Sequence, residues 1–367
     1  MVPIARRNLL REKGRLVVSC VGVGAAVVLI AVVAGIYDGF HEIATTYIEE
    51  SGADLIVAQE GSTDLFHSFS ILPLNLSDSI ASIPGVVSVS PLILRLVEVH
   101  SGESHSRAAV IGFQDLGGPW HTIKGTKNIV PGEIVLDEIF ANRNGLNVGS
   151  TVQINGKNFT VAGISTGTNV FIQQYAFVTF GDASGLVLPP GMTNYFFVRI
   201  SEQAISSEIS DRIQSVSPGL TVFTNKELAS SNSNFINDAF LPILLVLDFV
   251  GVLVGVMVIG LTVYTATIEK TKEYGILKAI GATNGQLFKV LLSQSMILSG
   301  LGFLAGVAIT AILTFVIGYF APSVVVSISL NLLVLVLGAT LTMGFVASYV
   351  PLRRVAHINP AVVFRRG

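Results

Sequence analysis

The stretch LVVSCVGVGAAVVLIAVVAGIY, residues 16–37, is apolar and carries no charge along its whole length. A helix that crosses a bilayer needs about 20 such residues, whereas the apolar core of a cleaved signal peptide has only about 7–15. No small-x-small cleavage site ends the run. The stretch therefore predicts an uncleaved first transmembrane helix, and with it an integral membrane protein.

Three further apolar runs follow, at 239–268, 290–320 and 330–350. The composition agrees with several spans, because 51% of the residues are hydrophobic and only 13% are charged, against about 25% charged in soluble domains. We therefore predict an α-helical membrane protein with four transmembrane helices. The run at 239–268 is long enough to include a stalk beyond the bilayer.

The charge distribution predicts the orientation of these spans. The short segments 1–15, 269–289 and 351–367 are basic, and the turn 321–329 carries no charge. Short loops rich in Lys and Arg stay in the cytoplasm. Four spans satisfy this for all three basic segments only when both termini are cytoplasmic. We expect a multi-pass protein of the cell (inner or cytoplasmic) membrane, with residues 38–238 outside.

Residues 38–238 are too long for a loop and predict a mixed α/β extracytoplasmic domain. Its outer parts read twice as strand, helix, strand: Ala53–Gln59, Leu76–Ile83 and Val86–Val99, then Tyr195–Ile200, Glu202–Val216 and Leu220–Thr224. This is the split βαβ arrangement. The middle, about 104–190, reads as mostly β, with a hairpin signal at Asn155-Gly156. We predict a split βαβ part with an inserted β-rich subdomain.

The polar stretch EKTKEYGILKAIGAT, residues 269–283, follows the second span. On a helix, Tyr274, Leu277 and Lys278 share one face and Ile276 and Ile280 share another. Gly281 is placed to end such a helix. A short amphipathic helix on the cytoplasmic side suits docking into a groove of a soluble partner.

This stretch resembles the signature that follows the second span in permeases of the MacB/FtsX-type ABC transporter family. Three other segments resemble that family: 5–15, the family's amphipathic N-terminal helix; 145–164, GLNVGS leading to FTVAGI; and 351–361, PLRRVAHINPA. The resemblance spans the whole chain. It implies an external domain with a porter-like α/β part and a β-rich insertion, as the strand pattern indicates.

The resemblance implies a permease that works by mechanotransmission. A dimeric cytoplasmic ATPase would bind ATP and Mg and push the 269–289 segment, and the spans would move the external domains. The substrate would be a peptide, antibiotic, lipid or lipoprotein, moved by export or extraction. A second permease copy, identical or related, is expected in the bilayer, with a periplasmic adaptor or extracellular partner as a further option. The resemblance implies no nucleic-acid partner.

The residues that the resemblance assigns to the ATPase contact are Lys272, Glu273, Tyr274, Gly275, Leu277, Lys278, Ile280 and Gly281, with Arg353, Arg354 and Pro360 of the tail. We predict no ATPase activity and no cofactor in this chain. A phosphate-binding loop needs G-x-x-x-x-G-K-[ST]. Its nearest match, at Gly156-Lys157, has Thr151 and Asn158 at the first and last positions. The ATPase is therefore expected to be a separate chain.

Two other functions stay open at this stage. One is FtsX-like signalling to an extracellular cell-wall hydrolase, although such members usually carry a smaller external domain. The other is a membrane sensor or binding protein that works without an ATPase. It explains the external domain but leaves the basic cytoplasmic segments without a role.

Two groups of polar residues have competing interpretations. Asp248 lies within the second apolar run, where an acid is costly, and is either an intramembrane polar contact or a hydrated residue on the stalk. Glu98, His100, Glu103 and His105 cluster in sequence. A solvated strand rim explains that cluster, so we predict no metal site.

Overall fold

The computed structural model describes residues 13–65, 68–102, 104–170 and 173–357. The chain forms two compact units. One contains residues up to 38, 240–320 and 326 onward, and the other contains 39–239 with 321–325. The predicted amphipathic helix at 1–15 falls mostly outside the described residues.

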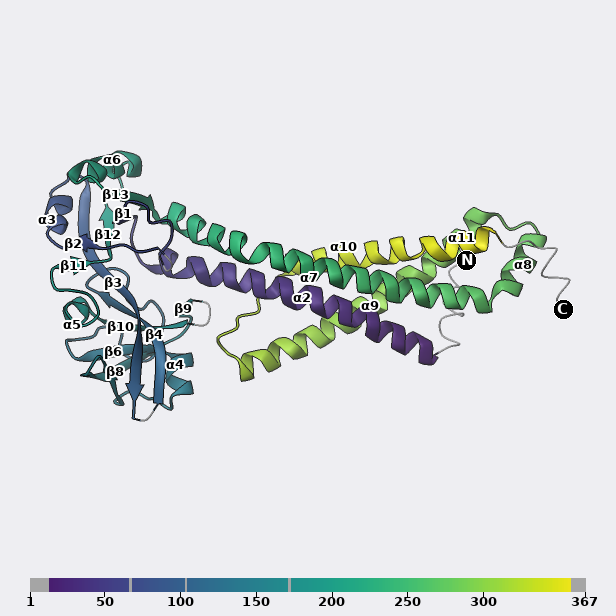
Figure 1. Cartoon of the computed structure of the whole chain (residues 1–367), viewed down its shortest axis with the longest axis horizontal. Coiled ribbons are helices and arrows are strands. Elements are labelled where there is room, and N and C mark those ends of the chain that lie inside the picture. Colours follow the sequence, from purple (N-terminus) through teal and green to yellow (C-terminus); the bar gives the residue numbers. More distant parts are fainter. Residues whose placement is uncertain (1–12, 66–67, 103, 171–172, 358–367) are drawn as a thin grey trace. The chain divides into compact units, whose positions relative to one another are not determined.

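Four long helices of the described chain are apolar enough to cross a membrane, as the sequence predicts. They are α2 (Lys13–Glu50), α7 (Asn225–Glu269), α9 (Asn284–Phe320) and α10 (Leu330–Ala347). Two short helices, α8 (Thr271–Ala279) and α11 (Tyr349–Ala356), follow α7 and α10 (Figure 1). Both α2 and α7 extend beyond their apolar runs. Their additional helical turns, around Tyr47 and Leu228, pack into the core of the α/β unit.

Glycines let the membrane helices approach closely. A Cβ added at Gly302 or Gly306 of α9 would collide with Val23 or Val27 of α2. On α7, a Cβ at Gly251 would lie 3.0 Å from Ile30 Cγ1. Small residues at four-residue spacing commonly form such contacts between membrane helices. Gly251 and Gly255 of α7, like Gly302 and Gly306 of α9, therefore form four-residue pairs that lie at helix contacts.

The first half of the α/β unit is a four-stranded antiparallel sheet in the order β13-β1-β12-β3. Its elements are β1 (Leu55–Gln59), α3 (Leu76–Ala81), β3 (Val86–Ser101), β12 (Tyr195–Ile200), α6 (Ser206–Val216) and β13 (Leu220–Thr224). One face, with Leu55 and Phe196, packs on α3 and α6. The other, with Ile56 and Phe197, packs on α2 and α7. The predicted split βαβ fold is confirmed.

The β-rich insertion lies between β3 and β12. Its elements are β4 (Ser104–Phe113), β5 (Thr122–Gly125), β6 (Glu133–Asp137), α4 (Glu138–Arg143), β7 (Thr151–Ile154), β8 (Lys157–Ser165), β9 (Asn169–Val170), β10 (Gln173–Thr179), α5 (Phe180–Ala183) and β11 (Met192–Thr193), with β2 (Leu72–Pro73) pairing to β11. Strand β3 runs through both halves, pairing first with β12 and then with β4. The β7–β8 hairpin turns at Asn155 and Gly156, whose φ angles are +46° and +86°.

Candidate functional site

The candidate site is the segment around α8, which lies between α7 and α9. Helix α8 ends at Ala279, just before Gly281, the predicted stop, whose φ of +101° favours glycine. There the N–H of Ala282 donates to the carbonyl of Leu277, and that of Gly281 to the carbonyl of Lys278. These two bonds satisfy the last carbonyls of the helix. The segment is therefore a defined helix with its own C-terminal cap.

One face of α8 is buried against the membrane helices. Tyr274 is only 3% exposed and packs in a cluster with Leu287, Leu291 and Val355. Its hydroxyl is hydrogen-bonded to Gln294 of α9, and burial raises the pKa of Tyr274 to about 12. Tyr274 therefore stays neutral at physiological pH and holds α8 in place.

Lys278 lies on the same side of α8. Its Nζ donates a hydrogen bond to the backbone carbonyl oxygen of Ala356, at 2.8 Å. Ala356 is the last residue of α11, where unsatisfied carbonyls give the helix end a partial negative charge. Lys278 thus joins α8 to α11. With Gly275 buried and Leu277 half-buried, four of the eight predicted contact residues of this segment face the permease itself.

The opposite face of α8 is open to solvent. Lys272 and Glu273 are exposed, and Ile276 and Ile280 are 41% and 76% exposed. Lys272, Ile276 and Ile280 follow one another at four-residue spacing and therefore form one stripe. Ile276 was not among the predicted contact residues. Its pairing with Ile280 on one face of a polar helix was the signal that pointed to it.

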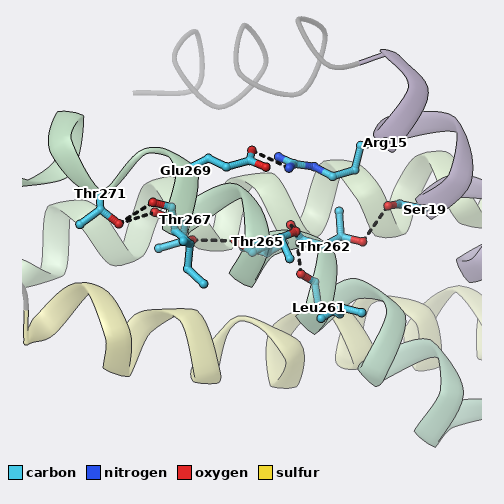
Figure 2. A network of polar contacts seen from close by, with 10 residues as sticks. Arg15, Ser19, Leu261, Thr262, Thr265, Thr267, Glu269 and Thr271 are labelled. Atoms are coloured by element: carbon cyan, nitrogen blue, oxygen red, sulfur yellow. Dashed lines mark hydrogen bonds and ion pairs between the residues drawn. The ribbon is translucent and has the colours of Figure 1, made fainter.

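Polar contacts link α7 to α2 near this site, and Figure 2 shows them. The guanidinium of Arg15 on α2 forms an ion pair with Glu269, the last residue of α7, at 2.6 Å. The hydroxyls of Ser19 and Thr262 lie 2.7 Å apart. Because Lys270 alone separates α7 from α8, these contacts connect the base of α8 to two membrane helices.

The remaining predicted residues belong to other segments of the chain. Arg353 and Arg354 are exposed on α11, and the Arg353 guanidinium lies 5.0 Å from the ring centroid of Tyr349. Pro360 lies outside the described residues. Asp248 is half-buried in α7, and its Oδ1 is buried without a hydrogen-bond partner in the described part of the chain.

The sequence cluster of Glu98, His100, Glu103 and His105 is brought together only in part among the described residues. His100 and His105 lie opposite each other on β3 and β4, with ring centroids 4.5 Å apart. Glu98 faces Arg107 at 4.0 Å, and Glu103 lies outside the described residues. The described residues include no group of three or more metal-ligating side chains.

Two protein-family models match most of this chain. The MacB-like periplasmic core domain matches residues 16–216, and the FtsX-like permease C-terminal region matches 245–360. An uncharacterised ABC transporter permease of Mycobacterium tuberculosis is 22% identical over 372 residues, 99% of each chain. Another, of Methanocaldococcus jannaschii, is 25% identical over 232 residues, which cover 60% of this chain and 58% of the relative.

Among solved structures, the periplasmic region of MacB from Actinobacillus actinomycetemcomitans is 15% identical, with a TM-score of 0.40. That comparison covers 51% of this chain and 96% of the other. The MacB-like core domain alone matches more than half of the chain, and the FtsX-like region covers most of the remainder. This chain belongs to the MacB/FtsX-like family of ABC transporter permeases.

Proposed function

We propose that this chain couples ATP hydrolysis by a separate ATPase subunit to movement of its extracytoplasmic α/β domain. The complex has two permease copies and two ATPase copies, and it exports or extracts a peptide, antibiotic, lipid or lipoprotein. In this proposal both termini and α8 lie in the cytoplasm. The basic segments at 269–289 and 351–367 support this orientation.

The observation that carries the proposal is the two-sided character of α8. Its outer stripe exposes Ile276 and Ile280, while its inner side is held by Tyr274 and Lys278. Two large aliphatic side chains exposed on a short polar helix favour a protein contact. A helix that is fixed on one side and apolar on the other is suited to fill a partner's groove and transmit its displacement.

The connections of α8 suggest how the displacement travels. Helix α7 is a single helix of 45 residues that begins at Asn225 and ends at Glu269, one residue before Lys270, the N-cap of α8. Its first turns belong to the α/β unit, where Asn225 Nδ2 donates to the carbonyls of Ile48 and Ala53. A push on α8 therefore acts on the helix that carries the last part of the external domain.

Co-purification tests the proposal. The full-length permease is expressed with its candidate ATPase and captured by a tag on the permease. Ile280→Glu places a charge in the contact, and we expect it to lower the amount of captured ATPase roughly tenfold or more. Ile205→Glu is the matched control, because Ile205 is 58% exposed but lies in the α/β unit.

Each outcome decides between functions. Loss of capture with Ile280→Glu and normal capture with Ile205→Glu support the coupling role. A wild-type permease that captures no ATPase favours the ATPase-independent sensor instead. Capture of a cell-wall hydrolase through the α/β domain, with the ATPase still bound, would favour signalling over transport.

A further inference from the structure

An apolar pocket of about 640 Å³ opens in the membrane unit, between α7, the start of α9 and the α10–α11 junction. Leu261 and Tyr264 of α7, Phe288 of α9 and Tyr349 of α11 are among its lining residues. Ligand pockets in proteins measure roughly 300–1,000 Å³. The pocket is therefore large enough for part of a small molecule or a lipid chain.

The pocket lies beside the junction at which α10 ends and α11 begins. Helices α7 and α10 meet at Gly260, where an added Cβ would lie 3.8 Å from Ala347 Cβ. Helix α10 ends at Ala347 and α11 begins at Tyr349. Pro351 has no N–H to donate to the Ala347 carbonyl, so the helix cannot continue unchanged. Gly260 is itself a lining residue and adds no side chain to the space.

The α11 residues beside the pocket include positively charged side chains and no acidic one. Tyr349 and Val350 line the pocket, and Arg353 and Arg354 follow each of them one turn later. The Arg353 guanidinium stacks over the Tyr349 ring at 5.0 Å from its centroid. Both arginines are exposed, and no acid occurs from 351 to 367. This surface is suited to an anion next to an apolar chain.

We propose that the pocket holds one anionic phospholipid from the bilayer. Its acyl chain lies against Leu261, Tyr264 and Phe288, and its phosphate lies against Arg353 and Arg354. The acyl chain alone gains little over the surrounding bilayer, because lipid tails are as apolar as the pocket walls. Selection therefore comes from the charged headgroup, as in other basic sites between membrane helices.

The site goes beyond the coupling function and adds a link to it. Helix α11 forms one wall of the pocket, and its last residue, Ala356, accepts the hydrogen bond from Lys278 of α8. A lipid bound against α11 thus stabilises the helix that holds α8. Binding itself requires only the permease, so it can be measured without any ATPase.

The test uses full-length permease purified from mixed micelles with equal phosphatidylglycerol and phosphatidylcholine, and counts retained lipids by native mass spectrometry. We expect one phosphatidylglycerol per wild-type chain. Leu261→Trp fills the pocket and should abolish this retention. Leu304→Trp on α9 is the matched control, since Leu304 and Leu261 are both 65% exposed and Leu304 lies outside the pocket. It should retain the lipid.

A second variant leaves the pocket walls unchanged. We expect each of Arg353→Gln and Arg354→Gln to lower the preference for phosphatidylglycerol roughly fivefold. Equal retention of the two lipids by the wild type, or unchanged retention in Leu261→Trp, would overturn the proposal. So would a change in oligomeric state in Leu261→Trp without loss of lipid, because the pocket would then belong to a contact between copies.

Discussion

Lys278 Nζ donates a hydrogen bond to the carbonyl oxygen of Ala356, 2.8 Å away, and so joins α8 to the C-terminal end of α11. The family resemblance assigns Lys278 to the residues that contact an ATPase. In the structure this side chain contacts α11 of the permease itself. The exposed residues of α8 and the inward-facing ones should therefore have separable effects, the first on ATPase binding and the second on transmission.

Removal of the Lys278 amine should impair transmission more than assembly. Lys278→Met keeps the aliphatic stem and loses the donor to Ala356. We expect near-normal capture of the ATPase but a several-fold smaller stimulation of its hydrolysis by the reconstituted permease. Lys272→Met, on the exposed stripe, should instead weaken capture. Equal effects of the two variants on capture would contradict the two-sided arrangement.

Tyr274 should contribute stability through both its ring and its hydroxyl. Tyr274→Phe removes the hydrogen bond with Gln294 and should lower the free energy of unfolding by about 1 kcal/mol. Tyr274→Ala also leaves a cavity under α8 and should cost about 3–5 kcal/mol. Thermal unfolding in detergent measures both. A Tyr274→Ala variant as stable as Tyr274→Phe would show that the ring does not hold α8.

Gly302 should tolerate no larger side chain. A Cβ at this position collides with Val23 of α2, whereas a Cβ at Gly300 on the same helix meets nothing within 4 Å. We expect Gly302→Leu to destabilise the membrane unit by about 1–3 kcal/mol, or to prevent its assembly. Gly300→Leu should behave like the wild type. The comparison requires only expression levels and melting temperatures in detergent.

Asp137 should make the α/β unit less stable as the pH rises. This side chain is fully buried, and burial raises its pKa to about 6, from 3.8, despite hydrogen bonds from Ile139 N–H and Thr168. The folded state therefore binds the proton more tightly than the unfolded state. Its contribution is fully present below pH 3.8 and is lost as the pH rises through about 6, which amounts to about 3 kcal/mol.

Trp120 reports on unfolding of the α/β unit, because it is the one tryptophan of the chain and packs against the core of that unit. Denaturant unfolding followed by its fluorescence should show stability falling between pH 4 and pH 7. Asp137→Asn does not titrate, so its slope over the same interval should be smaller. Identical slopes for the two proteins would mean that Asp137 ionises as freely in the folded state as in the unfolded chain.

The sequence predicts much of this fold because the relevant signals are local. Hydropathy locates the four spans, and short runs rich in aromatic and β-branched residues locate β12 and β13 at Tyr195–Ile200 and Leu220–Thr224, as observed. The parallel pairing of β4 with β10 and of β6 with β8 joins distant segments. No short-range pattern specifies such a pairing, so the insertion was predicted only as β-rich.

The sequence predicts the helix α8 but does not predict which of its faces is buried. Both faces of α8 carry aliphatic residues, with Leu277 on one and Ile276 and Ile280 on the other, so the helix period alone does not say which face is buried. Tyr274 decides it through its contacts with α9, which are tertiary. The helical turns at the end of α2, around Tyr47, were missed for the same reason, since their burial depends on the distant α/β core.

Site-directed crosslinking tests the central claim most directly. The only cysteine, Cys20, is replaced by serine, and single cysteines are introduced as Ile276→Cys, Ile280→Cys and, as an exposed control in the α/β unit, Val130→Cys. A short bifunctional reagent is then applied to the complex of permease and ATPase. We predict crosslinks to the ATPase from positions 276 and 280 and none from position 130. An assembled complex with no crosslink from 276 or 280, or with equal crosslinking from 130, would contradict the proposal that the exposed stripe of α8 binds the ATPase.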